Sequence, residues 1–272
     1  MTQGRSEFAK HAVLLLVCFF VFAPFYVMLI VSFKTDGQFA QEPWSLTFPI
    51  QWANYARAWH SVSPYIANSL IISTTVTVGA LLCASLAAFA FAKYRFPGRQ
   101  LLFFTIIALM MIPGVLNLIP AFVLVSKLRL LNTRWAVIFP AIAGSQAMGI
   151  YILRTFFTGI PDDLFDAARI DGAGVWGCYW HVALPMSKPI VGTLAVMIFV
   201  GQWNDYLWPL ITLFDNHKKT ITIGLAYLTG QHSTDWGPLM AGYVLASLPL
   251  IVIFLFSMKT FIRGLATGAI KM

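Results

Sequence analysis

The sequence predicts an all-α membrane protein with about six transmembrane helices, and three observations support this fold class. Of the 272 residues, 59% are hydrophobic and 10% are charged, whereas an ordinary soluble domain has roughly 25% charged residues. Stretches without a charged residue recur along the chain, and most reach the roughly 20 residues that a helix needs to cross a bilayer. The net charge of +8 is spread over the segments between these stretches, which is typical of a membrane protein and argues against a nucleic-acid partner.

Six helices are expected within a single transmembrane domain of residues 1–272, over residues 11–33, 66–92, 101–126, 135–157, 189–213 and 237–261. The first has the basic flank of a signal peptide, but its apolar run is too long and no small-residue cleavage pattern follows. We therefore expect it to remain as an anchor. Six crossings place both termini on one side. That side is expected to be the cytoplasm, because 11 of the 18 basic residues then fall in inner segments.

The segments that join the helices differ in character. The first outer segment, residues 34–64, is rich in Trp and Tyr and is expected to anchor the chain at the membrane surface. A tight basic turn at residues 93–99 contains a Pro-Gly pair and is expected to be a cytoplasmic hairpin. None of the three cysteines is placed to form an extracellular disulfide. The histidines lack the close spacing of metal ligands, so no metal site is expected.

Two expected helices carry polar residues that are candidates for a translocation pathway. Asp205 is the only acidic residue within an expected helix, and a carboxylate in mid-membrane costs about 2.5 to 3.5 kcal/mol on insertion scales. Two interpretations stay open: with Trp203 and Asn204 it contacts a solute, or it lies near the outer interface and supports packing between subunits. Asn117 lies in the third helix between two prolines, which indicate either a cavity-lining face or a packing kink.

The inner segment from 158 to 188 is too polar for lipid but has the pattern of folded structure. Pro161 suits the first turn of a helix, and two aspartates follow where the helix dipole favours negative charge. Apolar residues between 164 and 170 recur at helical spacing and predict one apolar side, and Gly172 offers a stop. The sequence therefore predicts a short amphipathic helix on the cytoplasmic face.

This amphipathic helix is expected either to lie flat on lipid or to contact another protein. Interfacial helices that bind anionic lipid are rich in Lys and Arg, whereas residues 162–171 contain four aspartates and one arginine. Anionic lipid would repel this segment. A protein partner is the better interpretation, and the two alanines of the segment would let that partner approach closely.

The loop resembles a motif of ATP-driven importers. Asp166-Ala-Ala-Arg-Ile-Asp-Gly172, nine further residues and Val182-Ala-Leu-Pro185 match the spacing of the EAA motif (E-A-A, three residues, G, nine residues, I-x-L-P) of ABC importer permeases. Asp166 replaces the glutamate of the motif and Val182 replaces its isoleucine. From Tyr65 onward the chain resembles the maltose-type sugar permeases in particular, at Ala67-Asn-Ser69, Tyr94-Arg-Phe-Pro-Gly98, Trp203-Asn-Asp205 and the ending from Arg263 to Ile270.

This resemblance implies the type I ABC importer permease fold and a non-catalytic subunit that moves a sugar or oligosaccharide across the cytoplasmic membrane of a bacterium or archaeon. In that family the loop forms a coupling helix that docks on a nucleotide-binding subunit. Carried over by position, the contact residues are Asp166, Ala167, Ala168, Gly172, Leu184 and Pro185.

The resemblance also implies partners: a second, different permease subunit, two ATP-binding cassette subunits and an extracytoplasmic solute-binding protein. No cofactor is implied for this chain itself, because ATP and Mg²⁺ bind to the cassette subunits. The sequence agrees with this division, since it contains no G-x-x-x-x-G-K-[ST] phosphate loop.

Other functions remain as alternatives. The solute of such a permease could instead be an amino acid, a polyamine or glycerol phosphate. A six-helix intramembrane enzyme is a rival from another class, but the sequence lacks both a G-x-S-x nucleophile and a histidine inside a membrane helix. A secondary transporter or channel is disfavoured because no inverted repeat is visible.

Overall fold

The computed structural model describes residues 2–229 and 235–269, and in these ranges every regular element is a helix and no strand occurs, which confirms the all-α class. Ile270, which ends the C-terminal segment compared above, lies outside the described residues. In chain order the elements are α1 (Thr2–Val31), α2 (Asp36–Gln41), α3 (Ala53–Lys93), α4 (Arg99–Leu109), η1 (Gly114–Asn117), α5 (Leu118–Lys127), α6 (Trp135–Gly144), α7 (Gln146–Thr158), α8 (Asp162–Ile170), α9 (Val175–Cys178), η2 (Tyr179–Ala183), α10 (Leu184–Met186), α11 (Lys188–Trp203), α12 (Leu207–Thr212), η3 (Asn216–Lys218), α13 (Ile221–Leu228) and α14 (Trp236–Ala269).

Three helical segments are long and apolar enough to cross a membrane by themselves: Lys10–Val31, Ala53–Lys93 and Trp236–Met258. Three further pairs of helices qualify if each bent pair is one span, so the described residues supply up to six spans. The apolar side chains of α1 are exposed, with Phe19 and Phe20 at 68% and 67% of their full area. Such a surface is unstable in water and is suited to lipid.

Three of the expected helices are broken. The helix expected at 135–157 consists of α6 and α7, which are bent by 42°. The helix expected at 101–126 consists of α4 and a second half that starts at Gly114, and the two halves are bent by 94°. The break falls at Pro113, which has no N–H for the helical ladder and disfavours the helical conformation at the residue before it. The helix expected at 189–213 ends at Trp203 and resumes as α12. The second expected helix starts earlier than expected, since α3 begins at Ala53.

The chain divides into two compact units, and the single transmembrane domain expected from the sequence stays a prediction. Unit 1 comprises Met1–Ile66 and Gly224–Pro249. Within it, Asn54 on α3 donates from Nδ2 to the carbonyls of Ser32 and Lys34, at 3.0 and 2.8 Å. The backbone N–H of Trp236 donates to Asp36 Oδ1 at 2.9 Å. These bonds hold the loop after α1 against the starts of α3 and α14.

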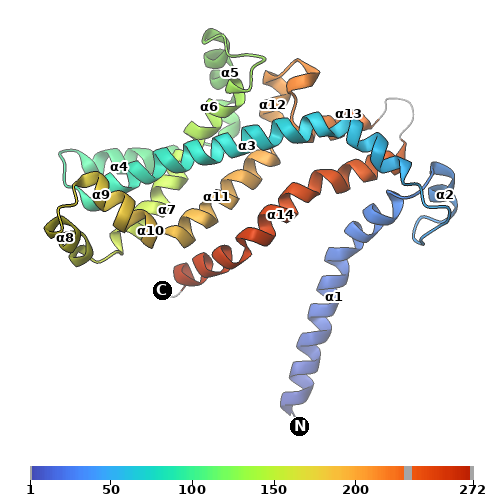
Figure 1. Ribbon diagram of the computed structural model, residues 1–272, viewed down its shortest axis with the longest axis horizontal. Coiled ribbons are helices and arrows are strands. Elements are labelled where there is room, and N and C mark those ends of the chain that lie inside the picture. The colour runs from blue at the N-terminus through green and yellow to red at the C-terminus, as the bar shows by residue number, and fades with distance from the viewer. Residues whose placement is uncertain (1, 230–234, 270–272) are drawn as a thin grey trace. The chain divides into compact units, whose positions relative to one another are not determined.

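Unit 2 comprises Ala67–Ile223 and Leu250–Met272 and contains all the residues predicted to be functional. Here α7 packs beside α4 and α11, and α6 packs beside α12 (Figure 1). One aromatic cluster joins four of its elements: the ring of Phe89 on α3 lies 5.5 to 6.2 Å from the rings of Phe157, Phe165 and Tyr179. Aromatic pairs in such contact contribute about 0.5–1.5 kcal/mol each beyond the area they bury.

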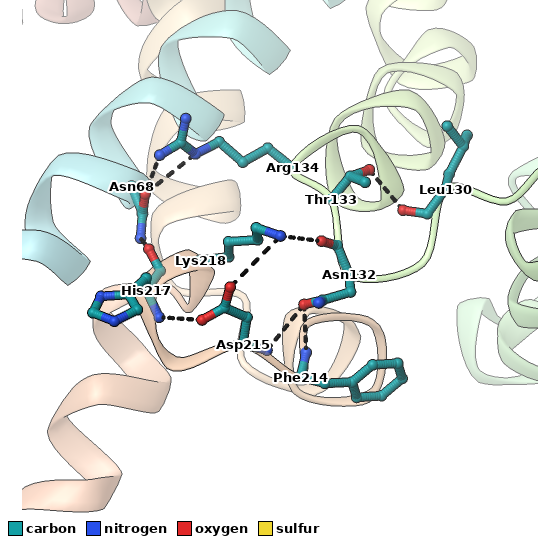
Figure 2. A network of polar contacts seen from close by, with 9 residues as sticks. All are labelled: Asn68, Leu130, Asn132, Thr133, Arg134, Phe214, Asp215, His217 and Lys218. Carbon is teal, nitrogen blue, oxygen red and sulfur yellow. Dashed lines mark hydrogen bonds and ion pairs between the residues drawn. The ribbon is translucent and has the colours of Figure 1, made fainter.

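A network of polar contacts joins α3, the turn before α6 and the segment around η3 within unit 2 (Figure 2). Asn68 accepts from Arg134 Nη2 at 2.7 Å and donates to the carbonyl of His217 at 2.7 Å. Asn132 has a left-handed backbone, with φ of 59°, and its Oδ1 accepts from the backbone N–H groups of Phe214 and Asp215 at 3.1 and 2.9 Å. Asn68, in the Ala67-Asn-Ser69 segment, therefore holds the loop after α12 against α3.

Candidate functional site

The predicted amphipathic helix forms α8, which ends in a Schellman motif. Asp162 and Asp163 occupy its first turn, where the helix dipole favours negative charge. At the other end, Gly172 has φ of 87° and donates its N–H to the carbonyl of Arg169 at 3.0 Å, while Ala173 donates to Ala168 at 2.8 Å. This pair of bonds satisfies carbonyls that the helix leaves free, and it requires a left-handed residue that glycine provides at little cost.

The apolar residues predicted on one side of this helix are buried to different extents. Phe165 is buried in the aromatic cluster, and Ala168 packs partly buried beside it. Leu164 and Ile170 are exposed, at 42% and 87%, and Ala167 is exposed between them. The helix is therefore attached to the core through Phe165 and Ala168, and its outer face exposes Ala167 and Ile170 together with aspartates.

Lys93, at the last turn of α3, attaches α8 to the membrane helices. Its side chain is 6% exposed, and its Nζ donates to the carbonyl of Ile160 and to Asp162 Oδ1, both at 2.6 Å. The same ammonium lies 4.5 Å from the centre of the Phe165 ring, a cation–π contact. The hydrogen bond from Lys93, and then its charge, lower the pKa of the Asp162 carboxyl below its ordinary value.

The remaining residues carried over from the EAA motif lie on or beside this attachment. Asp166 is exposed and forms an ion pair with Arg169 at 2.8 Å. After the turn, α9 and the π-helical η2 bring Tyr179 into the core, where its hydroxyl lies 2.7 Å from Ser85 Oγ of α3. Leu184 is partly buried against the aromatic cluster, and Pro185 is exposed.

The four residues predicted for the translocation pathway are not brought together. Asp205 lies in the break between α11 and α12, where its Oδ1 accepts from the N–H of Trp208 at 3.4 Å. Trp203 is buried and stacks on Phe199, with ring centres 5.8 Å apart. Asn204 is exposed and donates to a carbonyl of its own helix at 3.0 Å.

Asn117 is exposed at the end of η1. Of the four candidates, only Asp205 lines a cleft that lies within unit 2.

This cleft has a volume of about 470 Å³ and lies between the α6–α7 pair and the end of α11. Its lining is mainly apolar, and the polar residues among the lining are Ser145, Gln202, Asp205 and Trp208. Gln202, the one amide side chain in the last turn of α11, was not predicted from the sequence. A polar residue in an otherwise apolar span was the signal that could have found it.

The chain has the fold of a known class of membrane protein. The chain superimposes with a TM-score of 0.81 on a chain from the crystal structure of a bacterial ABC transporter involved in the import of the acidic polysaccharide alginate, covering 96% of this chain and 98% of that one at 23% identity. This likeness confirms the type I ABC importer permease fold.

Sequence comparison identifies the family. Residues 78–267 match the model of the binding-protein-dependent transport system inner membrane component, and the chain belongs to this family. It is 31% identical over 274 residues to the diacetylchitobiose uptake system permease protein NgcG of Streptomyces coelicolor, covering 99% of this chain and 91% of NgcG. It is 32% identical over 266 residues to the sn-glycerol-3-phosphate transport system permease protein UgpE of Yersinia pestis, covering 94% of each. The family places the chain among transport proteins rather than among intramembrane enzymes.

Proposed function

We propose that this chain is a non-catalytic permease subunit of an ATP-driven importer for a sugar or oligosaccharide, coupled to a separate ATPase through residues 158–188. The observation that carries the proposal is that α8 is attached to the core on one face and exposed on the other. Its inner face is fixed to α3 through Phe165 and Lys93, and its outer face presents Ala167 and Ile170 to solvent. An exposed apolar patch of this kind indicates a partner surface.

The coupling mechanism follows from these contacts. A nucleotide-binding subunit on the outer face of α8 pulls or pushes this helix when ATP binding closes the nucleotide-binding subunits. Because Phe165 packs against Phe89 and Lys93 binds the carbonyl of Ile160, the displacement passes to α3, which lines the core of unit 2. The small side chain of Ala167 and the turn at Gly172 allow the partner to approach closely. Leu184 and Pro185 bring the loop back to α11.

The proposed assembly contains a second permease subunit, two ATP-binding cassette subunits that bind ATP and Mg²⁺, and an extracytoplasmic solute-binding protein. The family description supports the last of these, since its members serve binding-protein-dependent systems. No cofactor or metal is assigned to this chain. We place it in the cytoplasmic membrane of a bacterium or archaeon with both termini in the cytoplasm, the arrangement that the basic residues favour.

The solute is proposed to be a sugar because two observations agree. Segments from Ala67 to Asp205 resemble the maltose-type permeases, and the relative NgcG is a diacetylchitobiose permease by name. The likeness to UgpE makes sn-glycerol 3-phosphate the leading alternative.

A glycine comparison within the loop tests the coupling role. Gly172 has φ of 87° and open space around it, whereas Gly174 has φ of −72° and equally open space. A side chain at Gly172 therefore meets only the backbone cost of the left-handed conformation, about 1–2 kcal/mol. We expect Gly172→Ala to slow uptake and the β-branched Gly172→Val to abolish it, with membrane insertion intact, while Gly174→Ala transports normally. Normal uptake by Gly172→Val would refute the role of the loop.

A further inference from the structure

The cleft of unit 2 is bounded by two interruptions of membrane helices. On one side α6 and α7 meet at Ser145 with a bend of 42°. On the other, α11 stops at Trp203 and α12 starts at Leu207. Lipid-exposed backbone cannot be left unpaired in the hydrocarbon region, so broken helices are tolerated where they line a cavity or are covered by protein. Ser145, Gln202 and Asp205 lie at or next to these breaks, and all three line the cleft.

Gln202 is a buried polar residue in the wall of the cleft. Its side chain is buried, at 8% exposure, yet no residue of the described chain accepts a hydrogen bond from its Nε2. A buried amide without a partner is costly, and such groups are rare in folded proteins. Because Gln202 lines the cleft, a rotation of its side chain would let Nε2 donate the missing bond to a ligand there.

The other polar groups complete a set suited to hydroxyl groups. The carboxyl of Asp205 accepts one weak bond, from the Trp208 N–H at 3.4 Å, and so retains free acceptor positions. The Ser145 hydroxyl donates to the carbonyl of Ala141 at 2.8 Å, which leaves its oxygen free to accept. Trp208 adds an indole ring, fixed by its Nε1 bond to the carbonyl of Ala136 at 2.9 Å, on which the apolar face of a sugar ring can pack.

The lining also excludes one class of solute. None of the described residues that line the cleft is Lys, Arg or His, while Asp205 is a carboxyl. An anion bound among mainly apolar walls needs a cation to offset the loss of its hydration. A phosphate or carboxylate solute would find an acid there instead.

From this geometry we infer that the cleft between α6–α7 and α11–α12 is a solute-contact site selective for neutral polyhydroxylated molecules, with Gln202 and Asp205 as its hydrogen-bonding residues. The inference rests on the proposed function and narrows its substrate class. The solute then contacts this subunit at Gln202 and Asp205. The chain differs in its solute from transporters of acidic polysaccharide or glycerol phosphate.

The test measures uptake in cells that express the whole transporter, compared with cells that lack this chain. The probes are maltotriose and N,N′-diacetylchitobiose as neutral solutes, and sn-glycerol 3-phosphate and trigalacturonate as anions. We expect chain-dependent uptake of a neutral probe alone. For that probe, Gln202→Leu and Asp205→Asn should each lower kcat/KM of transport about tenfold, the size of one lost buried hydrogen bond. The control variant Thr105→Val lies on α4 outside the cleft lining, where the Thr105 hydroxyl bonds the Leu101 carbonyl of its own helix at 2.9 Å, and it should leave transport unchanged.

Chain-dependent uptake of an anionic probe would overturn the inference, and so would unchanged kcat/KM in both polar variants. A third such outcome is permanent cross-linking of Gly201→Cys to a second permease subunit, because the cleft would then be a subunit interface. Purification of the complex separates this failure from failure of the proposed function. If an ATP hydrolase co-purifies and a neutral probe is imported while the cleft variants behave normally, only the cleft inference fails. If no hydrolase associates with the chain, the proposed function itself fails.

Discussion

Replacing Lys93 by Met should loosen α8 from the membrane helices without removing either element. Methionine keeps the apolar stem of the side chain, which is buried, and removes the ammonium. The lost contacts are the bond to the Ile160 carbonyl at 2.6 Å and the cation–π contact with Phe165 at 4.5 Å. A hydrogen bond to a charged group contributes about 1.5–3 kcal/mol, and a cation–π contact contributes at least the roughly 0.5–1 kcal/mol of an exposed pair. The sum is about 2–4 kcal/mol.

The ion pair with Asp162 adds little to this sum, because that carboxylate is 81% exposed and water screens it. A loss of about 2 kcal/mol raises the population of a locally opened loop about 30-fold. Amide hydrogen exchange of the purified complex measures this opening, since protection of residues 160–172 reports local free energy. We expect exchange there to accelerate at least about 30-fold, and solute uptake to fall with it.

Lys188→Met is the matched control, because Lys188 is an exposed lysine at the start of α11. It should leave exchange in the loop unchanged. Unaltered exchange of residues 160–172 in Lys93→Met would show that Lys93 does not hold α8, and the reasoning about force transfer to α3 would then be wrong.

Three further predictions concern unit 2. A Cβ on Gly149 would lie 2.8 Å from Ala84 Cβ, so Gly149→Ala should destabilise the packing of α7 on α3 by about 1–3 kcal/mol in thermal unfolding. The double variant with Ala84→Gly should recover this loss, and Gly144→Ala, which has open space, should be neutral. Asn132→Leu loses two accepted bonds at a left-handed residue and should cost roughly 2–4 kcal/mol, whereas Asn132→Asp keeps the acceptor and should melt close to the parent. The pKa of Asp215 is lowered, first by the backbone N–H of His217 and also by Lys218, so its contribution to stability is present above the ordinary pKa and is lost as pH falls through the lower folded value. Melting temperatures should therefore fall more steeply on acidification from about pH 5 to pH 3 in the parent than in Asp215→Asn, and parallel curves would contradict this assignment.

Hydropathy was enough to predict the all-α membrane fold class, and the six predicted spans compare with three to six candidate spans in the described residues. The breaks in the third and fifth spans were harder to place. Pro113 and Gly114 indicated a weak point, but the sequence does not say that the bend reaches 94°, because the angle is set by tertiary packing. Nothing in the residues 204–206 resembles a helix stop except Asn204, and the interruption there depends on contacts with α6.

The position and length of the loop could be predicted from the sequence, but which residues of α8 are buried could not. Periodicity alone groups Leu164, Phe165 and Ala168 on one apolar side, whereas the structure buries the last two and exposes the first. The deciding contacts come from Phe89 and Lys93, which lie more than 60 residues earlier in the chain. Long-range partners of this kind leave no local signal. Gln202 differs, because a polar residue in an otherwise apolar span is itself a local signal.

The central claim is that the outer face of α8 binds a nucleotide hydrolase, and a photo-crosslinking residue at position 167 tests it most directly. Ala167 is exposed at the centre of that face, and Phe19, exposed on α1, provides a lipid-facing control position. In membranes that contain the whole transporter, the account predicts an adduct between position 167 and an ATP-binding subunit, and no such adduct from position 19. A transporter that imports its solute while position 167 forms no adduct with any hydrolase would contradict the account.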